Sequence, residues 1–550
     1  MKAREGEGKS CREVSRVPCM DPFEPQSLRT ARDLFRLRRS PLSPSEEERL
    51  LAFGRWSREE LEPLGFEVDR YARPRFEAHD PLGQDVGRVV LSSGHRDGLR
   101  RLYEFGVVAD PLTGAQRFPF TFALMHEVAE VGFLCSVTVT LTTLVLLARY
   151  GGPGVRETML SPLLQGGGLA QGATWATEAH GGSDLGANAS VARPTANGLW
   201  ELRGEKYFCS NVGAAFALVS GRLEGGPPGI RGLRLFVVPA KRSDGQANFQ
   251  VRRLKDKLGT LTVPTGEVSF PGSEAHLLGG PGSGPGPVME MLNLSRTCNA
   301  IGSAALLQRL SELAELHARR RRAFGRELRD HPLLKGDLAT LRVEADAASL
   351  LALDVGLAYG REWAEPAQGR TSSPGLQLGA HVAKMVTAEQ AVRGAALAME
   401  VWGGAGYLEE FPLAKMARDA LVLPIWEGGA NLQALDSREL SAKGPCEEGW
   451  LKEAREVEGA AGSPSVRTEL GRLLGALQGP GDETDAKARL RLLGRLRQLT
   501  LLALRAESPG PSAEYREATA EGFVGIYPRD EPRGLLPSVA SRVLGGEDQG

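Results

Sequence analysis

The spacing of hydrophobic positions changes twice along the chain. Up to about residue 170, apolar residues recur at helical spacing, as in residues 46–53 and 97–103, and residues 120–148 predict a pair of long apolar helices. From there to about residue 285, short alternating or β-branched runs replace the helical period. The helical period returns after residue 288. The pattern therefore predicts an α+β protein in which a β-domain lies between two helical regions.

The middle region predicts a compact antiparallel β-domain. Turns rich in Gly, Pro and Asp separate its apolar runs, which is typical of short strands. We expect strands near residues 200–204, 216–220, 233–238, 249–254 and 266–270. The sequence GGPGSGPGP at residues 279–287 predicts a flexible linker that closes this domain.

The region after the linker predicts a bundle of antiparallel helices. Its helical segments span about residues 288–323, 333–364, 377–403 and 411–421, with a loop at 361–375. A chain of 550 residues exceeds what one hydrophobic core serves, so several domains are expected. The expected division is an N-terminal extension (1–40), a helical domain (41–170), a β-domain (171–285), a helical bundle (286–443) and a helical tail (444–550).

The tail contains an amphipathic basic helix. Leu and Arg recur at helical spacing over residues 487–505, a pattern that also occurs in nucleic-acid-binding proteins. However, residues 441–550 hold 15 basic and 17 acidic residues, so the positive charge is offset locally. The pattern therefore favours a solvated helix face on a small helical cap.

Composition limits the possible partners. The net charge of -1 gives no whole-molecule attraction to nucleic acid or to an anionic membrane. The six cysteines include no CxxC pair, which indicates reduced thiols in an intracellular protein, either mitochondrial or cytoplasmic. The histidines show no ligand spacing such as HExxH, and we expect no metal.

Two segments resemble targeting or membrane signals. Residues 131–148 are uncharged and about long enough to span a bilayer, but their five Ser and Thr residues favour a buried helix that lines a polar-edged pocket. Residues 29–40 are rich in Arg, as in a transit peptide, but acidic residues upstream favour a surface helix. We therefore expect no membrane span.

Glu427 is the first candidate for chemistry. It lies in IWEGGAN (Ile425–Asn431), between an aromatic residue and small residues. A carboxylate in apolar surroundings has a raised pKa and can abstract a proton near neutral pH. The glycines leave room for a flat ligand to approach the backbone. Taken alone, the segment favours a simple helix-start Glu beside a turn.

Two further segments carry hydroxyl and aromatic side chains. TEAHGGSD (Thr177–Asp184) can present backbone N–H groups and short donors to a planar polar ring. GEKYFCSN (Gly204–Asn211) places Phe208 and Ser210 on the same face of a strand. GGAGY (Gly403–Tyr407) follows a helix rather than a strand, so it does not predict a Rossmann dinucleotide site.

Taken in order, these motifs resemble the acyl-CoA dehydrogenase family. The order is TEAHGGSD, GEKYFCSN, KLG at Lys257–Gly259, RRAFG at Arg321–Gly325, GGAGYLEEFPLAKMARDA at Gly403–Ala420 and WEGGAN at Trp426–Asn431. The resemblance covers about residues 100–440, and LKDKLG, IWEG and FLCSVTVT are similar to the AidB-like branch. It implies a helical N-terminal domain, a central antiparallel β-barrel and a C-terminal four-helix bundle, with FAD between barrel and bundle and an extra helical segment after the bundle.

The resemblance implies roles on the substrate and flavin side. Glu427 matches the catalytic base, and Arg296 lies at a family position near the acyl-CoA. The implied flavin contacts are the loop hydroxyls of Thr177 and Ser183 (the latter also near substrate), the Phe208 ring on the isoalloxazine, Ser210 beside N5, and the polar side chain of Asn431.

The resemblance also implies a second cofactor contact. Arg321 matches an Arg that reaches the FAD pyrophosphate of a neighbouring subunit, and Phe324 packs by the adenine end of that cofactor. Gly403 and Gly404 match the adenosine-side glycines, and His331 stands where the family often has Gln. A homo-oligomer, dimer or tetramer, is therefore implied.

The resemblance implies an FAD-dependent acyl-CoA dehydrogenase. Glu427 would take the α-proton of a fatty acyl-CoA, a hydride would pass to flavin N5, and an electron-transfer flavoprotein would take the electrons. The alternative is a weakly active AidB-like flavoprotein that binds long acyl-CoA or nucleic acid in a protective or regulatory role. One departure is Gly429, which replaces the usual Thr or Ser after the Glu-Gly pair.

Overall fold

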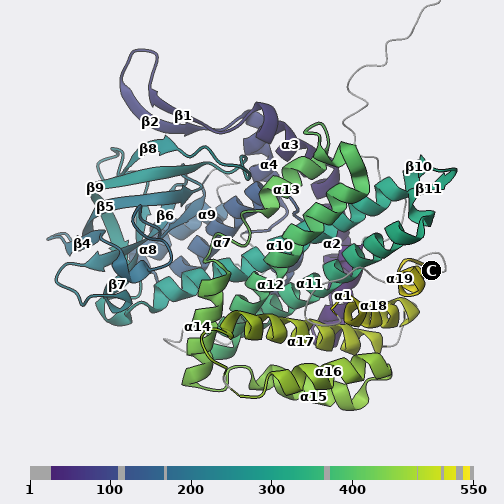
Figure 1. Cartoon of the computed structure of the whole chain (residues 1–550). Helices are drawn as coiled ribbons and strands as arrows, with labels where there is room; N and C mark the ends of the chain where they lie inside the picture. Colours follow the sequence, from purple (N-terminus) through teal and green to yellow (C-terminus); the bar gives the residue numbers. More distant parts are fainter. Residues whose placement is uncertain are drawn as a thin grey trace, which may run out of the picture.

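The protein is an elongated helical body with a β-domain at one end, as the computed structural model shows (Figure 1). The structure describes residues 26–108, 118–165, 170–364, 372–479, 481–508, 513–527 and 537–545. Cys11 and Cys19 lie outside the described residues, as do residues 365–371 of the predicted 361–375 loop, and the four described cysteines are free. Residues 361–364 and 374–375 of that predicted loop are helical instead.

The N-terminal region is helical, as predicted. Its elements are α1 (Gln26–Leu37), α2 (Pro44–Trp56), the π-helix η2 (Ser57–Leu61), α3 (Glu62–Tyr71), α4 (Ser93–Glu104), α6 (Phe118–His126), α7 (Val131–Tyr150), α8 (Pro153–Val155), η3 (Arg156–Leu160) and α9 (Ser161–Gln165). A capping box between Ser43 and Glu46 fixes the start of α2. The antiparallel hairpin β1 (Arg75–His79) and β2 (Asp85–Val90), which projects beside the β-domain, was not predicted (Figure 1).

Helix α7 is a buried core helix. Within the described ranges it is the one helix long and apolar enough to cross a membrane, and 83% of its apolar window is buried inside the protein. Its hydroxyls bond to the helix and to the next strand: Thr140 Oγ1 donates to Ser136 O (2.8 Å) and accepts from Gly172 N (3.1 Å). The predicted burial is thus correct. Thr140 and Thr143 bind the start of the β-domain, and the pocket-lining role of this helix stays a prediction.

The β-domain is a closed, mixed sheet. Its strands are β3 (Gly172–Trp175), β4 (Val191–Pro194), β5 (Trp200–Ser210), β6 (Phe216–Leu223), β7 (Leu233–Pro239), β8 (Gln250–Leu254) and β9 (Thr265–Leu277). All five predicted strands are present, and β3 and β4 are additional. Pairing runs from β6 through β4, β5, β9 and β7 back to β6, so the sheet closes on itself.

Two pairings in this sheet are parallel rather than antiparallel. Strand β6 runs parallel to β3 and to β4, whereas the other pairings are antiparallel. Parallel neighbours need a long connection, and here the β4–β5 hairpin supplies the length between β3 and β6. The sheet encloses its own core, which includes Trp175, Leu202 and Phe236.

The C-terminal region is built on three long helices. These are α10 (Gly286–Arg320), α11 (Pro332–Ala364) and α12 (Pro374–Trp402), followed by the shorter α13 (Pro412–Ala420) and α14 (Ala430–Lys443). The predicted linker before α10 is a tight turn with a short 3-10 helix, and Gly279 N donates to Tyr150 O at the end of α7 (3.0 Å).

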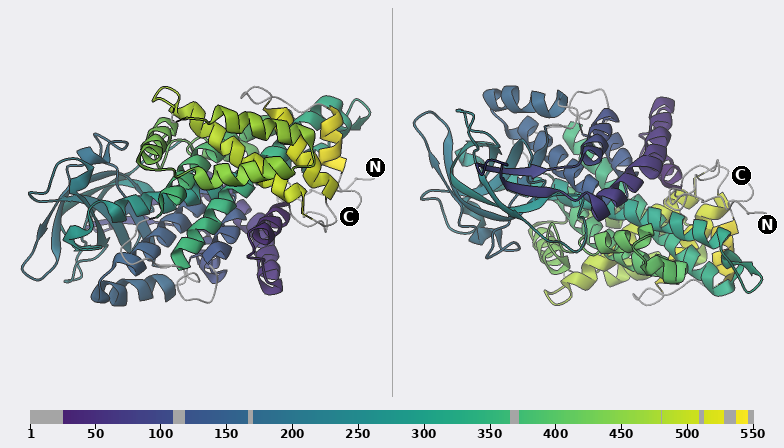
Figure 2. Two further views of the ribbon diagram at one scale, coloured as in Figure 1. Left: turned by 90° about the horizontal axis from the view of Figure 1, so that it is seen from below. Right: turned by 90° about the horizontal axis from the view of Figure 1, so that it is seen from above.

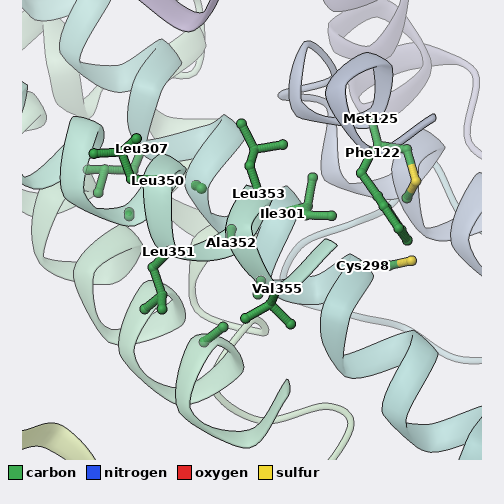
Figure 3. Packing of buried hydrophobic residues seen from close by; sticks show 14 of the residues in the cluster. Phe122, Met125, Cys298, Ile301, Leu307, Leu350, Leu351, Ala352, Leu353 and Val355 are labelled. Carbon is green, nitrogen blue, oxygen red and sulfur yellow. The ribbon is translucent and has the colours of Figure 1, made fainter. Parts of the chain in front are cut away.

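One apolar core joins the N-terminal helices to this bundle. Phe122 and Met125 of α6 lie against Cys298 and Ile301 of α10, with Val355 of α11 close by (Figure 3). Because these side chains come from both helical regions, the two regions share a core instead of meeting at a loose interface.

The tail packs along the bundle. It consists of α15 (Glu448–Ala460), α16 (Pro464–Ala476), α17 (Ala486–Ala506), α18 (Ala513–Ile526) and α19 (Pro537–Gly545), with α17 lying beneath α11 and α12 (Figures 1 and 2). The expectation of a solvated basic face on α17 is wrong for three of its arginines. Arg495, Arg497 and Arg505 are buried and pair with Glu469, Asp354 and Asp346.

Helix α1 is also part of the body. One face of this Arg-rich helix is buried, and Arg38 just after it donates to Asp354 of α11 (2.6 Å). Gln26 and Thr30 donate to Asp346 of the same helix. The predicted helix is present, but it packs against the bundle through one face instead of lying free on the surface.

Candidate active site

Glu427 lies in the loop between α13 and α14. Its backbone is left-handed, with a φ of 57°, and Gly428 follows with a φ of 93°. A left-handed conformation is unfavourable for a residue with a side chain, so the surroundings must hold it. The side chain of Gln433 does so in part, because its Nε2 donates to Glu427 O (2.8 Å) and to Gly428 O (2.9 Å).

Buried cations from two bundle helices complete this support. Arg296 of α10 donates through Nε to Glu427 O (3.2 Å). Lys384 of α12 donates to Pro424 O (3.1 Å) and to Gly428 O (2.7 Å). Both cations are buried, so they act on the loop in a region of low dielectric constant.

His381 connects these supports. Its Nδ1 lies 2.7 Å from Gln433 Oε1, and its Nε2 lies 3.3 Å from a guanidinium nitrogen of Arg296. Burial lowers the pKa of His381 to about 3, so the ring is neutral at physiological pH. Nδ1–H then donates to Gln433, and Nε2 accepts from Arg296.

The Glu427 carboxyl is in an environment that favours its protonated form. Burial raises its pKa above the ordinary value, and the charges of Arg296 and Lys384 oppose that rise. Burial lowers the pKa of Lys384 to about 7, and Glu427 opposes that fall. In the part of the chain that the structure describes, no side chain forms a hydrogen bond or ion pair with the Glu427 carboxylate. The carboxyl therefore has the properties of a general base whose pKa lies closer to neutrality than that of an exposed Glu.

Cys135 connects Glu427 to the β-domain. Burial raises the pKa of this α7 thiol to about 12, and the charge of Glu427 adds to the rise. The charge of Lys257 and a hydrogen bond to Ser210 oppose it. The thiol is therefore close enough to interact with both the predicted base and Ser210. Arg296 bonds to the Glu427 loop, and Cys135 interacts with both Glu427 and Ser210, so these three predicted residues share neighbours.

The two residues of β5 that are predicted to face the flavin lie on one side of the strand. Cys209 is buried in the β-domain, whereas Phe208 on the other face of the strand is 54% exposed. Ser210 lies on the same face as Phe208 by strand alternation, and its hydroxyl lies 3.4 Å from Thr265 Oγ1. An exposed aromatic ring beside a hydroxyl is a suitable platform for a planar ligand.

The TEAHGGSD loop is anchored beside that strand. Thr177 O accepts from Tyr207 N (2.9 Å), which joins the loop to β5. Glu178 forms a buried ion pair with Lys206 (2.8 Å) and accepts from Ser190 Oγ (2.7 Å). Thr177 is half-buried and Ser183 is exposed, so both hydroxyls lie on an anchored loop near the Phe208 face.

The remaining predicted cofactor residues form a second group at the far end of α10. Arg321 directly follows this helix, and Arg296 is near its start, so at 1.5 Å per residue the two lie roughly 37 Å apart. Phe324 is 96% exposed at this end. Gly403 and Gly404 lie at the same end of α10, because Trp402, the residue before them, stacks on His317 near the end of this helix.

His331 supports Phe324 in this second group. Its ring lies 6.1 Å from the Phe324 ring in an edge-on arrangement. Its Nε2 lies 3.1 Å from Ala323 O, and its Nδ1 accepts from Arg326 Nε (3.2 Å). The ring thus fixes the turn that carries Phe324.

Asn431 has a partner in the tail. Its Oδ1 accepts from Lys487 Nζ of α17 (2.9 Å), and the side chain is exposed. The flavin-facing role of Asn431 stays a prediction. Next to it, Gly429 begins α14 without a side-chain cap, and a Cβ at this position would meet nothing within 4 Å.

The sequence analysis did not identify several residues of this region. They are Lys384, His381, Gln433 and Cys135. A signal existed for two of them: His381 and Lys384 lie three residues apart in an otherwise apolar helical stretch, LQLGAHVAKMV. Polar residues at that spacing share a helix face, and burying them requires specific partners.

Comparison with known proteins agrees with this arrangement. Residues 173–272 match the middle domain of acyl-CoA dehydrogenases, and residues 282–439 match their C-terminal domain. Acyl-CoA dehydrogenase family member 11 of Caenorhabditis elegans is 30% identical over 429 residues, which cover 73% of this chain and 68% of the nematode protein. The chain belongs to the acyl-CoA dehydrogenase family. Members of this family are FAD-dependent oxidoreductases that act on a CH–CH bond.

Other relatives extend the comparison. AidB of Escherichia coli (strain K12) is 33% identical over 327 residues, covering 57% of this chain and 58% of AidB. The structure of Caenorhabditis elegans ACDH-11 in complex with C11-CoA is 24% identical, covers 100% of this chain and 98% of its own, and has a TM-score of 0.78. Acyl-CoA dehydrogenase from Bacillus anthracis complexed with FAD is 14% identical, covers 92% of this chain and 88% of its own, and has a TM-score of 0.69. The fold of these two structures therefore includes the tail region.

The residues of this chain fit FAD, the cofactor of the family. Phe208 presents an exposed ring on the strand that also carries Ser210. At the other end, a Cβ at Gly403 or Gly404 would meet nothing within 4 Å, so the backbone there is open to a ligand. The first group can hold a flavin ring, and the second can hold a nucleotide end.

Proposed function

We propose that this protein dehydrogenates a fatty acyl-CoA thioester between its α and β carbons, with Glu427 as the general base. The observation that carries the proposal is the Glu427 carboxyl itself. It lies on a left-handed turn that several side chains hold, burial raises its pKa, and its charge interacts with the Cys135 thiol, which also bonds to Ser210 of β5.

The loop also contributes to polarising the substrate. Gln433 and Lys384 bind the carbonyl oxygens of Glu427 and Gly428. Across the described residues, the N–H of Glu427 has no acceptor in the chain, so it remains available to the thioester oxygen. A fixed N–H at that oxygen stabilises the negative charge that develops when the α-proton leaves.

The cofactor supplies the second half of the reaction. When bound, FAD provides the acceptor for the hydride that leaves the β carbon. The Phe208 ring and the Ser210 hydroxyl would hold the flavin ring, with Thr177 and Ser183 on the adjacent loop. The solvent-poor region around Arg296 and Lys384 would keep water away from the reacting carbons.

We further propose a homo-oligomer and an electron-transfer flavoprotein as partners. Arg321 lies roughly 37 Å along α10 from Arg296, and Phe324 is close to Arg321. At that distance the flavin ring cannot contact both groups of residues. Contact with the cofactor of a neighbouring copy resolves this separation. Two electrons leave the substrate in each turnover, and an external flavoprotein would take them from the reduced cofactor.

The test is anaerobic titration of the purified, FAD-loaded protein with acyl-CoAs from short to long. We expect the visible flavin absorbance to bleach with one range of chain lengths; an undecanoyl thioester belongs in the panel because ACDH-11 binds C11-CoA. Glu427→Gln is expected to slow bleaching by about 10²–10⁴-fold, the usual contribution of a general base. The exposed carboxylate of Glu410 supplies the matched control, since Glu410→Gln should bleach like the wild type.

Other results would contradict the proposal. A yellow protein that binds acyl-CoA but is never bleached would favour a binding or regulatory flavoprotein instead. A protein that cannot be loaded with FAD would exclude both interpretations. Bleaching by Glu427→Gln at the wild-type rate would remove Glu427 from the reaction.

A further inference from the structure

Lys384 has unusual surroundings for a lysine. It lies in the middle of α12, its side chain is fully buried, and burial lowers its pKa to about 7. It forms no ion pair within 4 Å among the described residues, in contrast to the buried Lys206 and Lys415, which pair with Glu178 and Glu130. A buried ammonium without a counter-ion is costly, so its contacts with backbone carbonyls must account for its presence.

The two carbonyls that Lys384 binds lie on either side of Glu427. Pro424 is three residues before Glu427, and Gly428 is the next residue after it; their oxygens lie 3.1 and 2.7 Å from Lys384 Nζ. Of the loop carbonyls, Arg296 binds that of Glu427 and Gln433 binds those of Glu427 and Gly428. On the other side, Asn299 of α10 donates to Leu423 O (3.1 Å). Lys384 therefore joins a carbonyl before Glu427 to a carbonyl after it.

A closed turn matters because Glu427 has a left-handed backbone. Such a conformation persists only where its surroundings determine it. If the turn relaxed, φ of Glu427 would return to a negative value, and the Cα–Cβ bond would point in a different direction. The carboxylate would then move relative to Cys135 and the Phe208 face.

We propose that Lys384 is a positioning residue for Glu427: by holding the carbonyls of Pro424 and Gly428 together, it fixes the turn that directs the Glu427 carboxylate into the site. This inference rests on the proposed function only for its kinetic consequence. The structural consequence, a loop held by Lys384, can be measured on its own.

The structural test is amide hydrogen exchange followed by mass spectrometry. Lys384→Met keeps the length and the apolar stem but removes the donor. We expect peptides covering residues 421–429 to exchange at least ten-fold faster, because the turn opens more often, while peptides from α11 keep the wild-type rate. Lys443→Met is the matched control, since Lys443 is an exposed lysine on α14, and it should leave the loop unchanged.

A second variant covers the case in which Lys384→Met does not fold. Lys384→Gln keeps one N–H donor in place of the charge, and its loop peptides are expected to exchange at a rate between those of the wild type and the Met variant. Wild-type exchange of residues 421–429 in whichever variant folds would overturn the proposal.

The kinetic test asks whether Lys384 acts through Glu427. Lys384→Met should lower the rate of flavin reduction by acyl-CoA at least ten-fold and change the dissociation constant of a non-reactive acyl-CoA thioether less than three-fold. In the Glu427→Gln background the same substitution should have no further effect, because residues that act as a unit are not additive. An equal loss in both backgrounds would overturn the positioning role.

If no acyl-CoA reduces the wild-type flavin, the proposed function fails, whereas the exchange measurement still decides whether Lys384 holds the loop.

Discussion

The pair formed by Asp346 of α11 and Arg505 of α17 gives a sharp prediction about stability. Both side chains are buried, and Arg505 donates to Asp346 Oδ2 (2.6 Å). Gln26, Thr30 and Tyr515 complete the hydrogen bonds of the carboxylate at 2.7, 2.9 and 2.8 Å. Burial acts to raise the pKa of Asp346, but the charge of Arg505 and the hydrogen bonds from Arg505, Gln26 and Tyr515 together hold it below the ordinary value.

Arg505→Met removes the only cation bonded to this carboxylate in the described structure while keeping most of the buried volume. Breaking a buried ion pair from one side leaves an uncompensated charge, which costs roughly 3–5 kcal/mol. The comparison is Arg491→Met on the same helix. Arg491 is half exposed and pairs with Glu389 at the surface, so its loss should cost at most about 1 kcal/mol.

The deficit of Arg505→Met should grow with pH. In the wild type, the lowered pKa of Asp346 contributes stability that is present above its ordinary value of 3.8 and is lost only as pH falls through the folded value. Without Arg505, burial raises the pKa of Asp346 above that ordinary value. The folded state then binds more protons than the unfolded state, and stability falls as pH rises through this window. The variant should therefore lie closer to the wild type at pH 5 than at pH 8.

Urea denaturation at both pH values, followed by far-UV circular dichroism, measures these differences. The double variant Arg505→Met with Asp346→Asn should recover part of the loss, since no charge is then left buried. A deficit below about 1 kcal/mol, or one that is equal at pH 5 and pH 8, would refute the reasoning, because it would mean that the carboxylate is not desolvated.

Two further predictions concern the Glu427 carboxyl and the close contact between Gly259 and α13. The pKa of Glu427 is raised above its ordinary value of 4.5, and only the ionised carboxylate takes a proton. The rate of flavin reduction, measured by stopped-flow absorbance, should therefore rise with pH, with a midpoint above 4.5. A flat profile between pH 5 and pH 8 would contradict the raised pKa. Gly259→Ala should destabilise the protein by about 1–3 kcal/mol in urea denaturation, because its Cβ would lie 2.5 Å from the carbonyl oxygen of Arg418. Gly449→Ala, where nothing lies within 4 Å, should change stability by less than about 1 kcal/mol, and equal effects of the two substitutions would show that the close approach is not real.

Regular periodicity explains what the sequence predicted well. The strands at β5 to β9 and the helices α10 to α13 have long or strongly alternating patterns, and each was found near its expected place. Strands β3 and β4 have only four residues each, too few for alternation to be visible. The parallel pairing of β6 depends on how distant segments meet, which local patterns do not contain.

In the candidate site, too, local sequence patterns predicted some residues, whereas others depend on contacts between distant segments. Glu427 could be found from its local segment and the motif order, and the alternation of β5 placed Phe208 and Ser210 on one face. Lys384 could not be assigned, because its partners lie 40 and 44 residues away in a loop whose conformation is set by tertiary contacts. For the same reason, Arg505 was expected in solvent, since its partner lies 159 residues away.

These separations affect how the chain is made. Asp346 and Asp354 leave the ribosome with α11, whereas Arg505 and Arg497 follow 159 and 143 residues later. At a synthesis rate of 5–20 residues per second, roughly 7–30 s pass between the synthesis of these aspartates and that of the two tail arginines. During that interval Asp354 can pair with Arg38, but Asp346 lacks the cation that it has in the described structure, so burying it carries a penalty and the bundle is less stable until the tail is synthesised. A nascent chain stalled before α17 would therefore be a client for chaperones and proteases rather than a smaller working enzyme.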